Sequence, residues 1–120
     1  MRGRVAVAGV LAVLLGAADA RAHAFLERAE PRVGSTVRAA PAQVRLWFTE
    51  RLEPAFSRVQ VVDDAGRRVD RGDAAVDPAN PALLRISVGA IPAGSYRVIW
   101  RVVSVDTHVT GGDFVFKVAP

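Results

Sequence analysis

The sequence contains two histidines, and each lies where it could help to bind a metal ion. His23 directly follows the stretch Ala20-Arg21-Ala22, and His108 lies two residues after Asp106. In an extended segment, side chains two residues apart point to the same side, so an imidazole and a carboxylate with this spacing can reach one ion. Among first-row divalent ions, Cu(II) is the one that imidazole and amine nitrogens suit best.

The amino-terminal stretch has the three parts of a secretory signal peptide. Residues 2–4 provide a basic start, residues 5–18 form an apolar run, and residues 20–22 provide a small-x-small cleavage site. The alternative is a retained membrane anchor, which needs about 20 apolar residues, and this run is shorter. We therefore expect residues 1–22 to be removed and residues 23–120 to form one domain.

Cleavage after Ala22 would give His23 a free α-amine. That amine and the ring Nδ1 could chelate one ion in a six-membered ring, and a metal easily displaces the proton of an amine whose pKa is about 8. With Asp106 and His108, the donors would be three nitrogens and one oxygen, a set that favours tetragonal Cu(II). The less specific interpretation is a chance surface histidine and an Asp-x-His pair that only braces a loop.

The composition excludes some kinds of site. The sequence has no cysteine, and its single methionine is the initiator, so the processed chain would offer no thioether ligand for reduced copper. The formal charge is +4, and loss of the leader lowers it to about +2. The charges are interspersed without a basic block, which argues against nucleic-acid binding.

The elements that would position these residues are short β-strands. Apolar and polar residues alternate in segments bounded by turn signals, and we expect strands at 43–49, 57–63, 82–88, 94–105 and 112–118, with 67–69 as a partner strand. This pattern is typical of an antiparallel sandwich or a Greek-key barrel. Proline and glycine interrupt residues 29–41, where we expect an extended segment and a loop.

The large aromatic residues are interpreted as structural and not as functional. Tyr96 follows a Pro-x-Gly turn and opens a strand, as in the tyrosine corner of β-sandwiches. Trp47 and Trp100 lie inside expected strands, and large aromatic residues are mostly buried. The pair Asp106 and His108 would then lie in the turn between the last two strands.

Two long stretches of this sequence resemble the CopC-type copper resistance proteins. Residues 23–69 begin with the family's H-A-x-L start and continue into an L-x-F-x-E strand that ends at Glu50. Residues 94–118 follow the family's pattern G-x-Y-x-V-x-W-R-V-x-S-x-D-x-H-x-x-x-G-x-F-x-F-x-V. The resemblance covers residues 23–118, and its motifs are specific because they occur in order at suitable spacing.

The resemblance implies an all-β, seven-stranded Greek-key sandwich of the cupredoxin or immunoglobulin-like kind. It also implies a periplasmic protein, not an enzyme, that carries or stores one Cu(II) ion. His23, Asp106 and His108 match the family's ligand positions. Glu50 matches a glutamate near the copper, which either binds axially or orients a ligand; a solvated strand-end carboxylate is the alternative for Glu50.

The resemblance further implies a monomer whose partners are the copper ion and an inner-membrane copper transporter of the same system. Some family members carry a methionine-rich Cu(I) site, which has no counterpart in this sequence. Other relatives are fused to a membrane domain, and this sequence resembles the stand-alone form.

Two other functions stay open. Copper monooxygenases also begin with a copper-chelating histidine, but a carboxylate such as Asp106 would occupy the position that oxygen needs. A purely structural β-sandwich module is the second alternative, and it predicts no metal binding.

Overall fold

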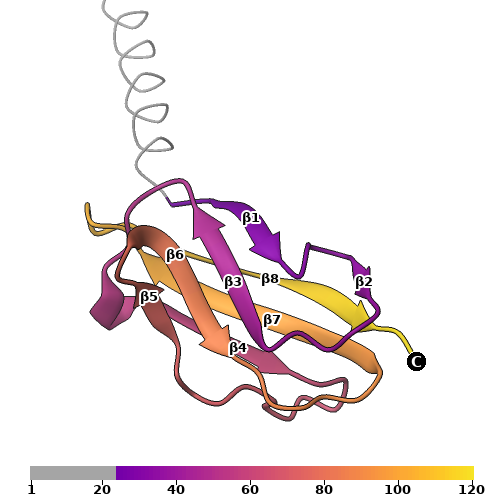
Figure 1. Cartoon of the computed structure of the whole chain (residues 1–120). Coiled ribbons are helices and arrows are strands. Elements are labelled where there is room, and N and C mark those ends of the chain that lie inside the picture. Colours follow the sequence, from indigo (N-terminus) through magenta and orange to yellow (C-terminus); the bar gives the residue numbers. More distant parts are fainter. Residues whose placement is uncertain (1–23) are drawn as a thin grey trace, which may run out of the picture.

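A computed structural model of the chain describes residues 24–120, so the expected leader and His23 lie outside the described residues. The described part is two β-sheets packed face to face (Figure 1). Its strands are β1 (Leu26–Glu30), β2 (Thr36–Val37), β3 (Gln43–Phe48), β4 (Arg58–Val62), β5 (Ala75–Asp77), β6 (Asn80–Ser87), β7 (Gly94–Val103) and β8 (Val109–Val118), with one 3-10 turn at Pro54–Phe56.

The first sheet has the order β1-β3-β6-β5 and the second has the order β2-β8-β7-β4. All neighbouring strands are antiparallel except β2 and β8. Most connections cross from one sheet to the other, as in Greek-key sandwiches. The expected all-β sandwich is therefore confirmed, with eight strands where the resemblance implied seven.

The extra strands are short, which explains why the sequence pattern did not reveal them. β2 has two residues and β5 has three, too few to show an alternation. β1 has five residues, but its pairing with β3 shifts between Leu26 and Arg28, so its buried positions do not alternate. The expected partner strand at 67–69 is reduced to a bridge between Val62 and Arg68.

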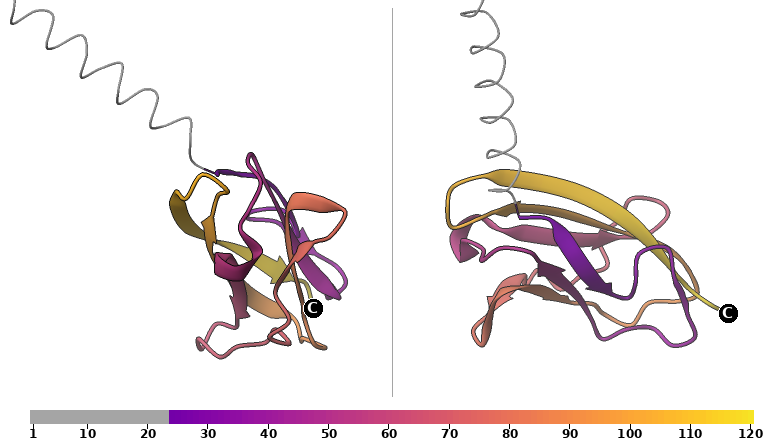
Figure 2. Two further views of the ribbon diagram at one scale, coloured as in Figure 1. Left: turned by 90° about the vertical axis from the view of Figure 1, so that its left-hand side faces the viewer. Right: turned by 90° about the horizontal axis from the view of Figure 1, so that it is seen from above.

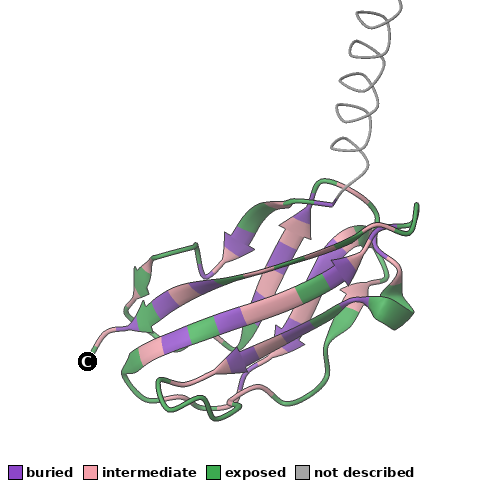
Figure 3. Cartoon of the chain, turned by 180° about the vertical axis from the view of Figure 1, so that it is seen from behind, coloured by how far each residue is buried: buried purple, intermediate pink, exposed green. Residues whose placement is uncertain are grey.

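The core lies between the sheets and is formed by alternate residues of the long strands, as Figure 3 shows for the sheet seen from behind. Val44, Leu46, Leu84, Val98 and Phe116 are inaccessible or nearly so. Burying side chains of this kind contributes about 1.5–3 kcal/mol each before the entropy of ordering is subtracted.

The aromatic residues have the structural roles expected, but one of them lies outside the core. Tyr96 donates a hydrogen bond from its hydroxyl to the Pro92 carbonyl at 2.5 Å, which confirms the tyrosine corner. The Trp100 ring packs edge-on against Phe48 at a centroid distance of 5.1 Å. Trp47 instead lies on the outer face of the first sheet, where the guanidinium carbon of Arg28 is 4.3 Å from its ring centroid.

One end of the sandwich brings together three distant parts of the chain. Figure 2 shows the first described residues, the chain after β3 and the β7–β8 connection at this end. In residues 24–120 there is no helix with the length and apolar character that a membrane span requires.

Candidate metal site

The β7–β8 connection is a tight turn, residues 104–108, that brings Asp106 and His108 together. His108 Nδ1 lies 3.7 Å from Asp106 Oδ1, and the two side chains are 35% and 49% exposed. Thr107, between them, has a φ of 71°, in the left-handed region. The two side chains lie close together, as the spacing predicted, and they lie in the turn where they were expected. The backbone between them is left-handed at Thr107 and not extended.

Ser104 holds this turn in place from the core side. It is fully buried, its backbone N–H donates to the His108 carbonyl at 3.0 Å, and its carbonyl accepts the Thr107 N–H at 2.8 Å. The Ser104 hydroxyl accepts the His108 N–H at 3.3 Å and donates to Asp106 Oδ1. The turn is therefore braced by one side chain that reaches both residues of the Asp-x-His pair.

The same serine lowers the pKa of the exposed carboxyl group of Asp106. The hydrogen bond from Ser104 is the largest cause that lowers the pKa of Asp106, desolvation opposes it, and the nearby His108 lowers the pKa further. Sequence reasoning missed Ser104. The signal was available, because a serine continues the inward-facing series of Val98, Trp100 and Val102 where an apolar residue is expected.

The first described residues are held against the start of β8 and the end of β3. Ala24 is fully buried, and its carbonyl accepts a hydrogen bond from Thr110 Oγ1 at 2.6 Å. The N–H of Phe25 donates to Thr49 Oγ1 at 2.9 Å, and the Thr49 N–H donates to the Phe25 carbonyl at 2.9 Å. Ala24, the neighbour of His23 in the sequence, is therefore anchored beside the start of β8.

Glu50 belongs to the third segment at this end. Its neighbour Arg51 accepts a hydrogen bond at its carbonyl from the Val105 N–H at 3.0 Å, so the chain after β3 contacts the 104–108 turn. The Glu50 residue is partly buried. Within residues 24–120, no three metal-binding side chains gather closely enough to hold an ion, so Glu50 does not form such a group with Asp106 and His108.

The donor groups in the described residues are of types that copper binds. An imidazole and an ionised carboxylate, close together and accessible from solvent, are ligands that Cu(II) accepts. Two donors would leave a bound ion incompletely coordinated. Further donors would have to come from a segment beside the turn.

Comparison with known families decides the kind of protein. The CopC domain model matches residues 26–119, which includes every strand of the sandwich. The chain belongs to the CopC family. The resemblance found in the sequence is confirmed, and with it the general assignment to copper binding and copper resistance.

Two relatives of this CopC domain have names that refer to copper. Copper resistance protein C from Pseudomonas syringae pv. tomato is 37% identical over 111 residues, which cover 88% of this chain and 87% of that protein. Copper transport protein CutJ from Bacillus subtilis is 31% identical over 98 residues, which cover 81% of this chain but 18% of that protein. These names describe copper resistance and copper transport, and neither describes a catalysed reaction.

A solved CopC structure has the same fold. The crystal structure of CopC from Methylosinus trichosporium OB3b matches with a TM-score of 0.76 and 36% identity, over 82% of this chain and 95% of that one. The agreement covers the sandwich that presents the 104–108 turn.

Proposed function

We propose that this protein is an exported Cu(II)-binding protein that sequesters or carries one copper ion in the periplasm. The observation that supports this most is the hydrogen bond from Thr110 to the Ala24 carbonyl, which ties the amino-terminal end of the described chain to β8. The Cα of His23 must lie about 3.8 Å from that of Ala24, and we propose that its donors reach Asp106 and His108 from there.

In this proposal the ion is bound by the α-amine and Nδ1 of His23, the imidazole of His108 and the carboxylate of Asp106. The lowered pKa of Asp106 keeps that ligand ionised, so copper displaces protons only from the nitrogen donors. Glu50 is assigned either an axial contact or the orienting of a bound histidine, as partners of metal ligands usually do. The protein donors then fill the four equatorial positions, which leaves none for oxygen and disfavours catalysis.

The proposal requires removal of residues 1–22, since an amide at His23 could not act as the amine donor. It includes a monomer that exchanges copper with an inner-membrane copper transporter of the same system. Support for such a partner comes from CutJ, a copper transport protein in which a region similar to this chain accounts for 18% of the length.

The test compares two forms of residues 23–120 that differ only at the α-amine. In a Lys117→Arg background the chain has no lysine, so acetylation can be directed to the terminal amine. Cu(II) titration and electron paramagnetic resonance of the free-amine form should give one tight, tetragonal, nitrogen-rich site. The acetylated form should bind at least about 100-fold more weakly, because one chelate ring is lost. Equal affinities of the two forms would refute the chelate.

A further inference from the structure

Two arginines face each other across the edge of the second sheet. β4 is the edge strand, and its pairing with β7 places Arg58 directly opposite Arg101. Both residues are exposed, and within the described chain neither forms an ion pair. Like charges directly opposite each other destabilise a pair of strands, so this arrangement has a cost.

Two carboxylates of this region, Asp113 and Asp70, are paired with other arginines, and a third, Asp73, accepts the Ser87 N–H. Asp113, on β8, lies 2.5 Å from the guanidinium of Arg97, and Asp70 lies 2.8 Å from that of Arg68. Arg58 and Arg101 therefore present their positive charge to whatever binds at this edge.

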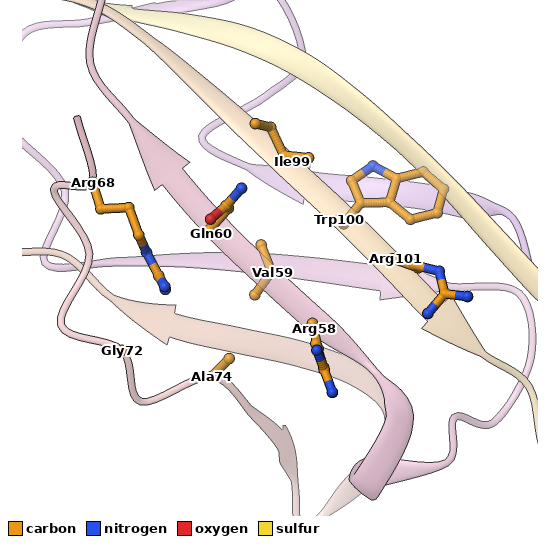
Figure 4. A pocket seen from close by; sticks show the side chains of 9 residues that line it. All are labelled: Arg58, Val59, Gln60, Arg68, Gly72, Ala74, Ile99, Trp100 and Arg101. Carbon is orange, nitrogen blue, oxygen red and sulfur yellow. The ribbon is translucent and has the colours of Figure 1, made fainter. Parts of the chain in front are cut away.

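These arginines border a hollow of about 390 Å³ beside β4. Figure 4 shows the side chains of Arg58 and Arg68 extending along this hollow, with Gly72 and Ala74 on the side away from β4 and Arg101 on the neighbouring strand β7. The hollow thus combines a positively charged rim with an edge strand.

Backbone groups of the edge strand also point toward the hollow, where Val59 is one of the lining residues and is 4% exposed. The Val61 N–H donates to Asp70 Oδ2 at 2.8 Å, and the Val61 carbonyl accepts the Val69 N–H at 2.9 Å, so both groups of Val61 point away from β7. In an antiparallel pair this direction repeats every second residue, so the N–H and carbonyl of Val59 point the same way. Within the described chain, no residue hydrogen-bonds to them on that side.

We propose that this edge binds a short extended acidic segment of a partner protein. Such a segment would accept the Val59 N–H, donate an N–H to the Val59 carbonyl, and thus add a brief strand to the second sheet. Its residue next to that pairing would lie on the same face as Arg58, because side chains alternate along a strand. A carboxylate there would make charge-assisted hydrogen bonds with Arg58 and Arg101 and offset their repulsion.

An inorganic anion matches this edge less well than a peptide does. It could bind to the arginines and to the Val59 N–H, but it would leave the Val59 carbonyl without a donor and would face that carbonyl's partial negative charge. The segment must be short, because the chain at residues 67–70 already covers the edge from Val61 onward.

The test uses the intact 15N-labelled protein, without copper, and the peptide acetyl-TEVEVT-amide, followed by amide chemical shifts. We expect saturable shifts at residues 58–60 and 72–74. The glutamine peptide acetyl-TQVQVT-amide should bind the parent protein at least about tenfold more weakly. The glutamate peptide should bind the double variant Arg58→Gln and Arg101→Gln more weakly by the same factor. In each case charge-assisted hydrogen bonds are lost. Thermal unfolding should show that this variant is at least as stable as the parent, because a repulsion is removed.

The matched control is the double variant Arg32→Gln and Arg38→Gln, which removes the same charge from exposed positions outside the hollow. It should change the affinity less than about twofold, as expected for weak, screened attraction. Equal weakening in the two double variants would overturn the proposal in favour of non-specific attraction. Undiminished binding of a peptide N-methylated at both valines, or the same shifts with sodium sulfate, would overturn the strand-like pairing.

Discussion

Asp70 and Asp106 are carboxylates that follow strands of the second sheet, and their surroundings differ. Asp70 is 1% exposed and accepts hydrogen bonds from Arg68 and from the N–H groups of Val61 and Gly72. Asp106 is 49% exposed, and its hydrogen-bond donor in the turn is Ser104. Both carboxylate oxygens of Asp70 accept hydrogen bonds from the protein. In Asp106, Ser104 orients Oδ1, and the side chain remains partly exposed.

The two groups reach a lowered pKa in different ways. Burial raises the pKa of Asp70, but the hydrogen bonds from Arg68, Val61 and Gly72 outweigh it and the pKa is lowered. For Asp106 the hydrogen bond from Ser104 is itself the largest cause. The side chain of Asp70 is thus enclosed by the protein, whereas that of Asp106 remains partly exposed to solvent.

The largest effect on copper is expected from His108→Ala. The variant should lose at least about 100-fold in Cu(II) affinity, because a nitrogen donor is removed from the site. Its unfolding temperature without copper should change little, since the side chain is 35% exposed. Calorimetric titration and differential scanning calorimetry measure the two quantities, and unchanged copper affinity would exclude His108 as a ligand.

The opposite pattern is expected from Asp70→Asn. The free energy of unfolding should fall by about 2–3 kcal/mol, because charge-assisted hydrogen bonds are lost and an amide is turned toward Arg68. Copper affinity should stay within about twofold of the parent, since local effects on distant ligands are small. Urea unfolding and copper titration of the same sample test both, and a large loss of copper affinity would break the distinction between the two carboxylates.

Ser104→Ala should have an intermediate effect on copper affinity, through its hydrogen bond to Asp106. The pKa of Asp106 should rise toward its ordinary value, because its main stabilising hydrogen bond is lost. Copper affinity should fall about tenfold, as is typical when a group that orients a ligand is removed. Carboxyl 13C NMR follows the pKa, with Ser95→Ala, on β7, as the matched control.

The smallest expected effect is the change, at acid pH, in the contribution of Asp70 to the free energy of unfolding. Its pKa is lowered in the folded state, so its contribution is fully present above the unfolded value of about 3.9 and is lost as the pH falls through the folded pKa. The difference in unfolding free energy between the parent and Asp70→Asn should therefore be constant from pH 7 to about pH 5 and shrink below about pH 4. A difference independent of pH would mean that the lowered pKa does not stabilise the fold.

Much of the sandwich could be predicted from local pattern alone. The strands β3, β6, β7 and β8 are long enough for apolar residues to alternate several times, and this alternation reflects one buried face. β2 and β5 are too short to alternate, and the contact of the outward-facing Trp47 ring with Arg28 depends on the pairing of β1 with β3. These features arise from pairing between distant residues, which a local pattern does not contain.

The sequence by itself determined the candidate donors, because residue type and spacing are enough to identify an imidazole and a carboxylate two positions apart. Tertiary structure alone decided what surrounds them. Thr110 and Ala24 are 86 residues apart in the chain, yet their hydrogen bond places the first described residues beside β8. In the same way, Arg58 and Arg101 become neighbours only through strand register. Donor chemistry resides in single residues, whereas proximity is a property of the folded chain.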